Sequence, residues 1–450
     1  MSRRIGGFDL SKQSVLSHLW RVRAQCLSLI LYALFSSALN AEPVVDLIYS
    51  GNIDGELEPC GCSETGNMGG LKRHATVIDR LRAATPDVFA VSAGGLISAF
   101  TANEKLTAEY ILKGKQALAY DAIGVQWSDL AYGEPFLRPY ALPWVATNLA
   151  SDQFAPSRTI TKAGVKLAVF SWLDPQTAPD AAMHFGENRL STDGKALVEE
   201  IRRAKTGGAV TVLLTTLPYA QVKDEFDLNY VDILFVKAGY EVFGEPKLEG
   251  RTLVLQPGSR GMRIGQVTIM LDRGNRIASF EHTVHLMPPD VPDAPRMEAW
   301  YAEYNAKVKA AYEESVKHRA IIDAGSAAYV GAMGCATCHQ SQYKTWETTK
   351  HSGAYHVLMD VNKAFDPACI VCHTVGFGEE GGFVDDLLTK HLVHVQCENC
   401  HGAGRDHVKS AGTEPLAKSG WPKEQVCGQC HVPKHSPEFR LEEYWPRISH

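Results

Sequence analysis

Short apolar runs alternate with longer segments of mixed polarity over residues 44–290. The runs have the length and composition of strands. In segments such as residues 72–83 and 195–204, the apolar positions recur at helical spacing. The strands predicted in this way are residues 44–49, 88–92, 145–148, 167–172, 210–214, 233–236, 252–256 and 266–271. This alternation of strands and helices predicts an α/β domain over residues 42–290.

The pattern changes after the last predicted strand. The prolines that mark a linker here are Pro288, Pro289, Pro292 and Pro295. From residue 297 to residue 312, apolar and aromatic side chains recur at the spacing of one helix face. We expect one amphipathic helix that reaches about residue 321, within a linker region of residues 291–325. Its aromatic side chains are expected to pack one domain on the other.

Cysteine and histidine are concentrated in the C-terminal part of the chain. Eight of the 11 cysteines and 11 of the 17 histidines lie in residues 335–450. The eight cysteines form four C-x-x-C-H segments, which are Cys335-Ala-Thr-Cys338-His339, Cys369-Ile-Val-Cys372-His373, Cys397-Glu-Asn-Cys400-His401 and Cys427-Gly-Gln-Cys430-His431. This pattern is typical of c-type haem attachment, in which the cysteines bind the porphyrin and the histidine binds the iron. Zinc also binds C-x-x-C pairs, but it does not need a histidine after each pair.

The sequence therefore predicts four covalently bound haem c groups in a domain of residues 326–450. In this prediction, His339, His373, His401 and His431 are the proximal iron ligands. The histidines that remain for the opposite axial positions are His351, His356, His391, His394, His407, His435 and His450. Two histidine ligands per iron favour electron transfer, whereas an iron with an open position binds a small molecule.

Residues 331–435 resemble the tetrahaem cytochrome c-554 family in the order and spacing of several motifs. These motifs are Cys335-x-x-Cys-His with Tyr343, Trp346 and His351, then Cys369-Ile-Val-Cys-His-Thr-Val-Gly-Phe377, then Val395-Gln-Cys-Glu-Asn-Cys-His-Gly-Ala-Gly404 with His407. The resemblance implies a mainly helical domain around closely packed haems that transfers electrons. It also implies that His351 and His407 are distal iron ligands.

One position departs from the family pattern. His394 stands where the family prefers glycine, so the resemblance leaves open how at least one haem is ligated. His394 and His435 are further candidates for distal ligands. One family member has an iron without a distal ligand, which implies that an open site can occur in this fold.

Residues 44–285 resemble the 5'-nucleotidase and UDP-sugar hydrolase family, which belongs to the calcineurin-like metallophosphatases. The matching motifs are Leu47-Ile-Tyr-Ser-Gly-Asn-Ile-Asp-Gly-Glu-Leu-Glu-Pro59, Gly69-Gly-Leu-Lys-Arg73, Tyr120-Asp-Ala122, Leu142-Pro-Trp-Val-Ala-Thr-Asn-Leu149 and Leu253-Val-Leu-Gln-Pro-Gly-Ser-Arg-Gly261. The resemblance implies a metallophosphatase-like αββα sandwich, followed by the helical cytochrome domain.

The metal ligands of that family are not retained. Ser92 stands at the position of the bridging aspartate, and Gly95 stands three residues further on, where the family has an acidic residue. The other positions that correspond to family ligands hold Asn52, Asp54, Trp127, Ser128 and residues 238–240. Two divalent ions need several oxygen and imidazole ligands that converge on one point. We therefore expect no dimetal phosphatase activity.

Cys60 and Cys62 are the only cysteines of the N-terminal domain, and they follow its first predicted strand directly. A Cys-x-Cys pair can exchange electrons as a dithiol, form a structural disulfide or bind a metal. A disulfide across one residue closes almost no loop, so it would stabilise the fold little. We therefore favour a redox role for Cys60 and Cys62.

Residues 1–41 have the order of a secretory signal. Arg21 and Arg23 precede an apolar run over residues 26–35, and cleavage is expected after Ala41. The alternative is a retained anchor, although the run is too short to span a bilayer. Cleavage leaves 40 basic and 50 acidic side chains, a formal charge of −10, which argues against nucleic acid as a partner.

The sequence thus predicts an exported tetrahaem cytochrome with no membrane span after signal cleavage. The signal is of the Sec type, and it places the protein in the periplasm or at the cell surface. The expected partners are other cytochromes or a membrane quinol oxidoreductase. The alternative is an oxidoreductase that couples a Cys60/Cys62 dithiol, or one open haem site, to the haem chain.

Overall fold

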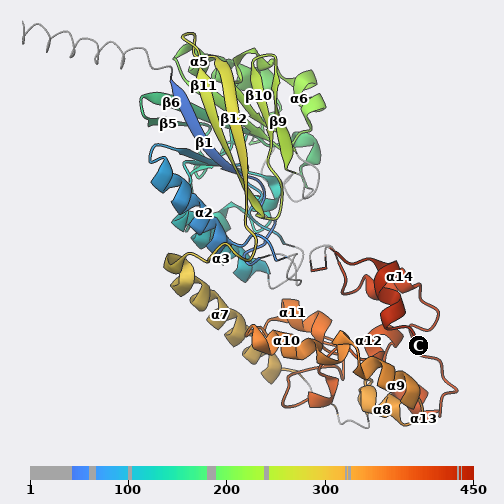
Figure 1. The fold of residues 1–450 in the computed structure, drawn as a ribbon. Coiled ribbons are helices and arrows are strands. Elements are labelled where there is room, and N and C mark those ends of the chain that lie inside the picture. The colour runs from blue at the N-terminus through green and yellow to red at the C-terminus, as the bar shows by residue number, and fades with distance from the viewer. Residues whose placement is uncertain are drawn as a thin grey trace, which may run out of the picture.

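The structure is a computed structural model that describes residues 43–59, 67–99, 104–179, 189–237, 243–319, 322, 326–432, 435, 436 and 438–450. Figure 1 shows a sheet-rich N-terminal region and a helical C-terminal region, with the long helix α7 (Glu298–Lys317) leading from one to the other. The predicted signal segment, Cys60 and Cys62 lie outside the described residues.

The first sheet has β1 (Val44–Ser50) near its centre. This strand pairs with β11 (Arg263–Leu271) in antiparallel fashion and with β2 (Phe89–Ser92) in parallel. The full order is β12 (Ile277–Leu286), β11, β1, β2, β3 (Ala122–Gly124) and β4 (Trp144–Val145). Because parallel strands end at the same edge, Ser50 and Ser92 face each other in the register of β1 and β2.

The second sheet also has six strands. Its order is β5 (Arg158–Lys162), β6 (Val165–Trp172), β7 (Val210–Thr215), β8 (Ile233–Phe235), β10 (Thr252–Gln256) and β9 (Gly244–Glu249). The four inner strands run parallel, and the two edge strands are antiparallel to their neighbours. The inner strands are continuous apolar runs because both of their faces are buried.

The two sheets pack face to face over a shared apolar core. This core includes Leu47 and Val91 from the first sheet and Leu167, Val212 and Phe235 from the second. The helices on the outer faces are α2 (Leu71–Ala84) and α3 (Glu104–Ala117) over the first sheet and α5 (Gly194–Thr206) and α6 (Tyr219–Glu225) over the second. The predicted αββα sandwich is therefore the observed architecture.

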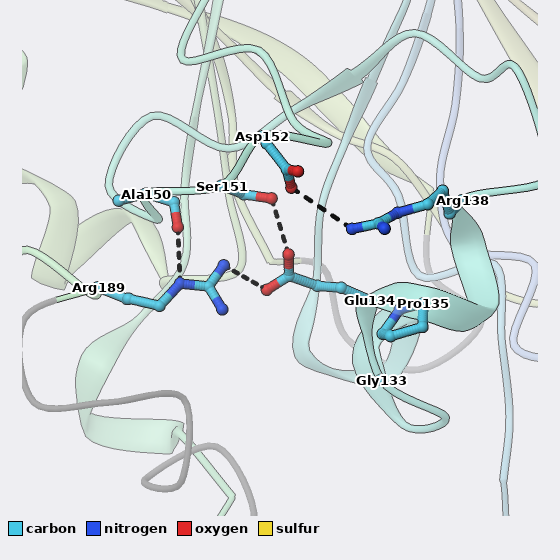
Figure 2. A pocket seen from close by; sticks show the side chains of 8 residues that line it. All are labelled: Gly133, Glu134, Pro135, Arg138, Ala150, Ser151, Asp152 and Arg189. Atoms are coloured by element: carbon cyan, nitrogen blue, oxygen red, sulfur yellow. Dashed lines mark hydrogen bonds and ion pairs between the residues drawn. The ribbon is translucent and has the colours of Figure 1, made fainter.

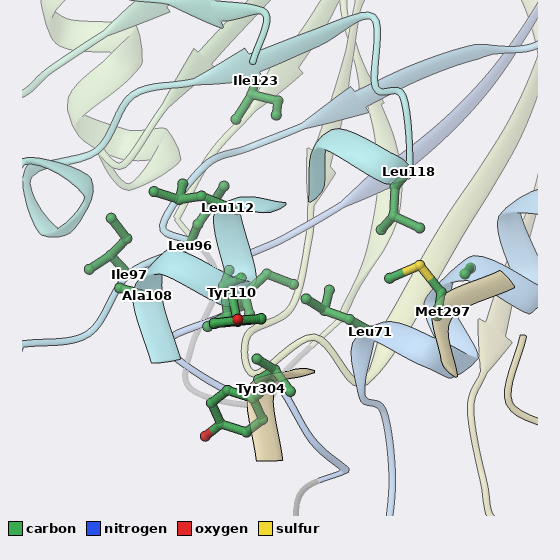
Figure 3. Packing of buried hydrophobic residues seen from close by; sticks show 14 of the residues in the cluster. Leu71, Leu96, Ile97, Ala108, Tyr110, Leu112, Leu118, Ile123, Met297 and Tyr304 are labelled. Carbon is green, nitrogen blue, oxygen red and sulfur yellow. The ribbon is translucent and has the colours of Figure 1, made fainter. Parts of the chain in front are cut away.

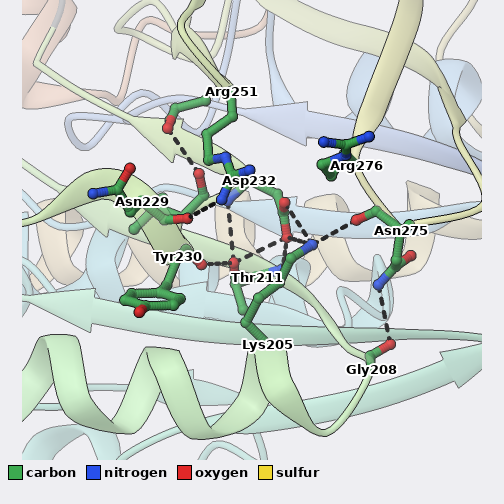
Figure 4. A network of polar contacts seen from close by, with 12 residues as sticks. Lys205, Gly208, Thr211, Asn229, Tyr230, Asp232, Arg251, Asn275 and Arg276 are labelled. Atoms are coloured by element: carbon green, nitrogen blue, oxygen red, sulfur yellow. Dashed lines mark hydrogen bonds and ion pairs between the residues drawn. The ribbon is translucent and has the colours of Figure 1, made fainter.

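A partly buried ion pair ties the second sheet to its helix layer (Figure 4). Lys205, in the last turn of α5, donates to Asp232 Oδ1 at 2.7 Å and to the carbonyl oxygen of Asn275 at 2.6 Å. Asp232 also accepts the backbone N–H of Thr211 at 2.9 Å. Each carboxylate oxygen is thus hydrogen-bonded, as a buried charge requires.

Helix α7 packs against the sandwich with its first half (Figure 3). The Tyr304 ring lies 5.4 Å from that of Tyr110, and Trp300 Nε1 donates to the Tyr110 carbonyl. In its second half, Tyr312 donates to the carbonyl of Val384 in the C-terminal region. The helix therefore contacts both regions, as its aromatic positions predict. It ends at Lys317 rather than near residue 321, since His318 and Arg319 continue only as a turn.

The C-terminal region consists of short helices around a small apolar core. The helices are α8 (Ala332–Ala336), α9 (Gln340–Glu347), α10 (Ala354–Asp360), α11 (Pro367–His373), α12 (Cys397–His401), α13 (Arg405–Lys409), α14 (Lys423–Cys427) and α15 (Leu441–Tyr444). Tyr355, Ile370, Phe383 and Leu392 are buried there, and they join the apolar cluster that continues through α7.

Candidate functional site

Each C-x-x-C-H segment includes or follows a short helix. Two segments end helices at their histidines, His373 in α11 and His401 in α12. The other two begin at Cys335 within α8 and at Cys427, the last residue of α14. Because residues three apart lie on one helix face, α11 and α12 turn both cysteines of the second and third segments to the same side. That is what two thioether bonds to one porphyrin edge require.

The four segments adjoin in two pairs. Cys335 and Cys397 are joined by a side-chain hydrogen bond, which brings the first and third segments together. Cys372 and Cys430 are joined in the same way, which brings the second and fourth segments together. Groups bound at these cysteines would therefore be close neighbours.

Three histidines that follow C-x-x-C pairs have a partner ring at one common separation. The ring centroids of His339 and His407 are 6.2 Å apart, and those of His431 and His351 are also 6.2 Å apart. The rings of His401 and His450 are 6.0 Å apart. An iron held by two imidazole nitrogens at about 2 Å each would separate the centroids by about 6 Å. The spacing therefore fits an iron between each pair.

The hydrogen bonds of the rings point to the same conclusion. The Nδ1 atom lies 2.7 Å from the Glu414 carbonyl oxygen in His407, 2.6 Å from that of Ala354 in His373, and 2.9 Å from that of Ile448 in His450. A carbonyl can only accept, so Nδ1 carries the proton and Nε2 keeps a free electron pair. Histidines that bind metals are held in this way. Burial also lowers the pKa of His351, His401 and His431, which favours the neutral ring that iron needs.

His373 differs from the other three. Among the described residues, the structure gives it no ring pair of this kind. His394 does not face it across such a gap. Its ring instead lies 4.7 Å from that of His356 in an edge-on contact, and its Nδ1 accepts the backbone N–H of Tyr355 at 3.1 Å. His435 donates its backbone N–H to the Val432 carbonyl, so it lies in a turn after the fourth segment.

Glu398, which the sequence analysis did not single out, positions the first and third segments. The buried Glu398 carboxylate accepts the backbone N–H groups of Val330, Gly331 and Gly404. Burial raises the pKa of this carboxyl group, and the three N–H groups oppose that rise. His450 pairs with a histidine 49 positions earlier in the chain. Only its residue type could have suggested it.

In the N-terminal region, Asn52 and Gly95 lie in direct contact. A Cβ atom added to Gly95 would be 2.4 Å from Asn52 Cγ, so Asn52 fills the space of the side chain that Gly95 lacks. The amides of Asn52 and Gln126 exchange hydrogen bonds of 2.8 and 3.1 Å. Asp54 accepts from Asn52 and from the backbone of Arg260, and burial raises its pKa.

Ser92 contacts a different set of groups. It lies with Ser50, Lys115 and Tyr120 in a buried polar cluster. Lys115 Nζ is 3.3 Å from Ser50 Oγ and 3.4 Å from Ser92 Oγ, and it sits 3.9 Å from the centre of the Tyr120 ring. Burial lowers the pKa of Lys115 to about 7, although Asp129 opposes this.

Two further predicted positions complete this part of the site. Trp127 Nε1 donates to the carbonyl of Asp174, and Ser128 lies in the same short 3₁₀ turn. Residues 238–240 lie outside the described residues. Among the residues that the structure describes, no group of three or more His, Cys, Asp or Glu side chains is arranged to hold a metal ion.

The segment that leads to Cys60 touches the C-terminal region. Glu58 forms an ion pair of 2.7 Å with Lys363 and accepts a hydrogen bond from Tyr301 of α7. Lys363 also lies 3.5 Å from Asp366, whose side chain caps α11 at the backbone N–H of Ala368. Helix α11 carries the second C-x-x-C-H segment. One charge cluster therefore links the loop that follows β1 to that segment.

An open pocket of about 620 Å³ lies elsewhere, beside α4 (Glu134–Leu137), as Figure 2 shows. Glu134 accepts from Ser151 at 2.7 Å and from Arg189 at 2.6 Å. Arg138 lies 3.7 Å from Asp152 across the mouth. No residue that the sequence analysis singled out as a candidate lines this pocket.

Residues 334–402 match the family model of cytochrome c554 and c-prime. The chain is also 33% identical over 140 residues to cytochrome c-554 of Nitrosomonas europaea. That match covers 24% of this chain and 60% of the relative. The chain thus spans less than two thirds of the length of this relative. Among the described residues, no helix is long and apolar enough to cross a bilayer.

Two solved structures resemble the fold. The 5'-nucleotidase precursor of Thermus thermophilus has a TM-score of 0.50 at 15% identity, over 71% of this chain and 68% of its own. The sulfate thiohydrolase SoxB of the same organism has a TM-score of 0.50 at 16% identity, over 58% and 60%. The N-terminal region thus has the fold of the 5'-nucleotidases, and the C-terminal region matches the family model of cytochrome c554 and c-prime, which supports a c-type cytochrome with covalently bound haem.

Proposed function

We propose that this protein is an exported cytochrome with four haem c groups that carries electrons between redox partner proteins. The observation that carries the proposal is the set of three imidazole pairs, His339 with His407, His431 with His351 and His401 with His450. An iron with two strong axial ligands changes its charge by one electron and has no position for a substrate.

The chain's own residues hold and orient the groups. The eight cysteines of the four C-x-x-C-H segments would attach the porphyrins, and the histidine after each pair would bind one face of the iron. When bound, the haem supplies the one-electron chemistry. The carbonyls of Glu414, Ala354 and Ile448 hold the Nδ1 protons of His407, His373 and His450, so the Nε2 atom of each ring is left free to bind an iron. The contacts of Cys335 with Cys397 and of Cys372 with Cys430 support short distances between the haems of the first and third segments and between those of the second and fourth.

The test is a haem count together with a low-temperature EPR spectrum of the oxidised, haem-loaded protein. We expect four haems per chain by the pyridine haemochrome assay. At least three of them should give the low-spin signals of two histidine ligands. A count below four would contradict the tetrahaem assignment. A loaded protein with mainly high-spin iron would contradict the electron-carrier proposal.

A second function is favoured by the different environment of His373. If the iron of the Cys369 segment has an open position, that haem would bind or reduce a small nitrogen or sulfur compound. A high-spin EPR signal of one iron and a carbon monoxide complex of the same stoichiometry would support this function. Four low-spin irons and no binding of carbon monoxide would exclude it.

The ion pair of Glu58 with Lys363 favours a third possibility, an electron exchange between a Cys60/Cys62 dithiol and the haems. Glu58 stands two residues before Cys60, and Lys363 stands six residues before Cys369. In this function, two thiolates form a disulfide and give two electrons, one to each of two ferric haems. Cys60→Ser would then slow haem reduction by a small dithiol, while the haem count stays at four. An unchanged rate would exclude the function.

Export and partners belong to the same proposal. We infer a Sec-type signal in residues 1–41, a periplasmic or cell-surface location, and partners among other cytochromes or a membrane quinol oxidoreductase. Covalent haem attachment suits an exported chain. The mass of the mature protein tests the first step, since cleavage after Ala41 leaves a chain that begins at Glu42.

A further inference from the structure

A single peptide group joins two histidine rings beside the second C-x-x-C-H segment. The carbonyl oxygen of Ala354 lies 2.6 Å from His373 Nδ1, and it accepts the proton of that ring. The N–H of the same peptide, on Tyr355, donates to His394 Nδ1 at 3.1 Å. The C=O and N–H of a trans peptide point in opposite directions. His373 and His394 therefore lie on opposite sides of this peptide. His394 contacts the peptide that holds His373, the expected proximal ligand.

The backbone at His394 is held in an uncommon conformation. Its φ angle is +73°, which residues other than glycine rarely adopt. Hydrogen bonds on both sides fix it, because Gln396 Nε2 donates to the Val393 carbonyl and the backbone N–H of Val395 donates to the His351 carbonyl. A strained conformation persists only where the surroundings hold it, and such positions occur at functional sites.

The tautomer of His394 follows from this contact. Tyr355 is the second residue of α10, and the N–H groups of a first helical turn have no partner within the helix. His394 supplies the acceptor, so its Nδ1 carries no proton and the neutral ring holds its proton at Nε2. The edge-on contact with His356 at 4.7 Å keeps the ring in this orientation.

Hydrogen bonds in a chain strengthen one another. When Tyr355 N–H donates to His394, the Ala354 carbonyl oxygen becomes a stronger acceptor. The stronger acceptor pulls the Nδ1 proton of His373, which makes Nε2 more basic. A more basic imidazole stabilises ferric iron relative to ferrous iron, which lowers the reduction potential of the haem it binds.

We propose that His394 is a positioning residue for His373, and that it lowers the reduction potential of one haem through the Ala354–Tyr355 peptide. This inference rests on the proposed function, since it needs a haem at the Cys369 segment. It gives His394 a role different from that of a distal ligand. The resemblance leads one to expect glycine at position 394. With histidine there, one haem of this chain would be a weaker electron acceptor.

Two substitutions at His394 separate the hydrogen bond from the backbone. Glycine and asparagine both tolerate a positive φ angle, so neither adds backbone strain. In asparagine, Oδ1 stands at the same number of bonds from Cα as Nδ1 does in histidine, so His394→Asn keeps an acceptor for Tyr355 N–H. His394→Gly removes the acceptor. The experiment is a potentiometric titration of the full haem-loaded chain, followed by visible absorbance and EPR.

We expect His394→Gly to shift the potential of one haem to a more positive value and to leave the others unchanged. His394→Asn should stay close to the wild type. His356→Ala, an exposed position, should shift the same haem in the same direction by a smaller amount, and it keeps the test available if the glycine variant does not load haem. If the haem potentials are unchanged in both His394→Gly and His356→Ala, or if these variants only lower the melting temperature, then His394 is a helix cap and the inference is overturned. A count below four haems in the wild-type protein would instead contradict the proposed function, so the two failures can be told apart.

Discussion

At the scale of the residue, Lys115 is the charged member of the buried polar cluster that it forms with Ser50, Ser92 and Tyr120. Its ammonium group is fully buried among the hydroxyls of Ser50 and Ser92 and against the face of Tyr120. A buried cation costs free energy unless it is paired, and its nearest polar neighbours are uncharged. The lowered pKa of about 7 expresses this cost.

This cost predicts how stability depends on pH. The pKa of Lys115 falls from 10.5 in the unfolded chain to about 7 in the fold. Between these values the unfolded chain binds more protons, so the free energy of unfolding rises as pH rises from about 7 to 10.5. Lys115→Met should remove this rise and raise the free energy of unfolding at pH 7 by about 1 kcal/mol. Thermal unfolding from pH 7 to 10 measures it, with the exposed Lys105→Met as control.

The ring pairs give a second prediction at this scale. His407→Ala removes the ring that faces His339 at 6.2 Å, so one iron should lose a strong axial ligand. We expect one additional high-spin haem and one additional site for carbon monoxide, with the haem count unchanged. His391→Ala is the matched control, because no ring pair of this kind involves it among the described residues. An unchanged EPR spectrum in His407→Ala would contradict the pairing.

At the scale of the element, the contact between the two regions depends on α7 and on one charge cluster. Lys363 is about 10% exposed and lies between Glu58 and Asp366, so its charge is compensated from both regions. Opposite charges at this position raise the pKa of Lys363 despite its burial. The cluster therefore favours the docked arrangement over a separated one.

Removal of one member should loosen this docking. Glu58→Ala leaves a buried lysine with half of its compensation, at a cost of about 2–4 kcal/mol. In differential scanning calorimetry, we expect the transition of the C-terminal region to move to a lower temperature and to separate from that of the sandwich. Glu199→Ala, which breaks an exposed pair with Arg202, should change stability by less than about 0.5 kcal/mol. Equal shifts in the two variants would argue against the role of the cluster.

Most inner strands are predictable from the sequence, and most edge strands are not. All eight predicted strands correspond to strands of the structure, while β3, β5, β9 and β12 were missed. Three of these four lie at sheet edges, where fewer positions are buried and the apolar run is lost. Helix α3 was missed because Gly114 and several charges interrupt its pattern. A Cβ on Gly114 would lie 2.9 Å from Trp300, so the glycine serves a contact that only the folded chain reveals.

The residues of the candidate site also fall into those that the sequence predicts and those that only the fold brings together. The C-x-x-C-H segments are local, so their spacing predicts the attachment residues directly. Distal partners are not local. His407 and His351 came from a resemblance, whereas His450 meets His401 only because the chain folds back. His394 has the residue type of a ligand, and the sequence shows neither its backbone conformation nor its contact with Tyr355.

At the scale of the whole molecule, one apolar cluster extends from the first sheet through α7 to the C-terminal helices. The two regions therefore form one continuous body rather than two domains on a free linker. The electrostatic field of the whole chain therefore acts on a partner that docks on either region. Without residues 1–41 that chain carries 40 basic and 50 acidic side chains, and each haem would add two propionates.

This net negative charge predicts how the protein meets its partners. Electrostatic attraction raises association rates with a basic partner, and salt screens that attraction within about 10 Å at 0.1 M ionic strength. The rate of electron transfer to a basic cytochrome c should therefore fall several-fold between about 10 and 200 mM salt. The rate with ferricyanide, an anion, should rise over the same range. Stopped-flow absorbance measures both, and a basic partner whose rate ignores salt would show that the overall charge does not guide the encounter.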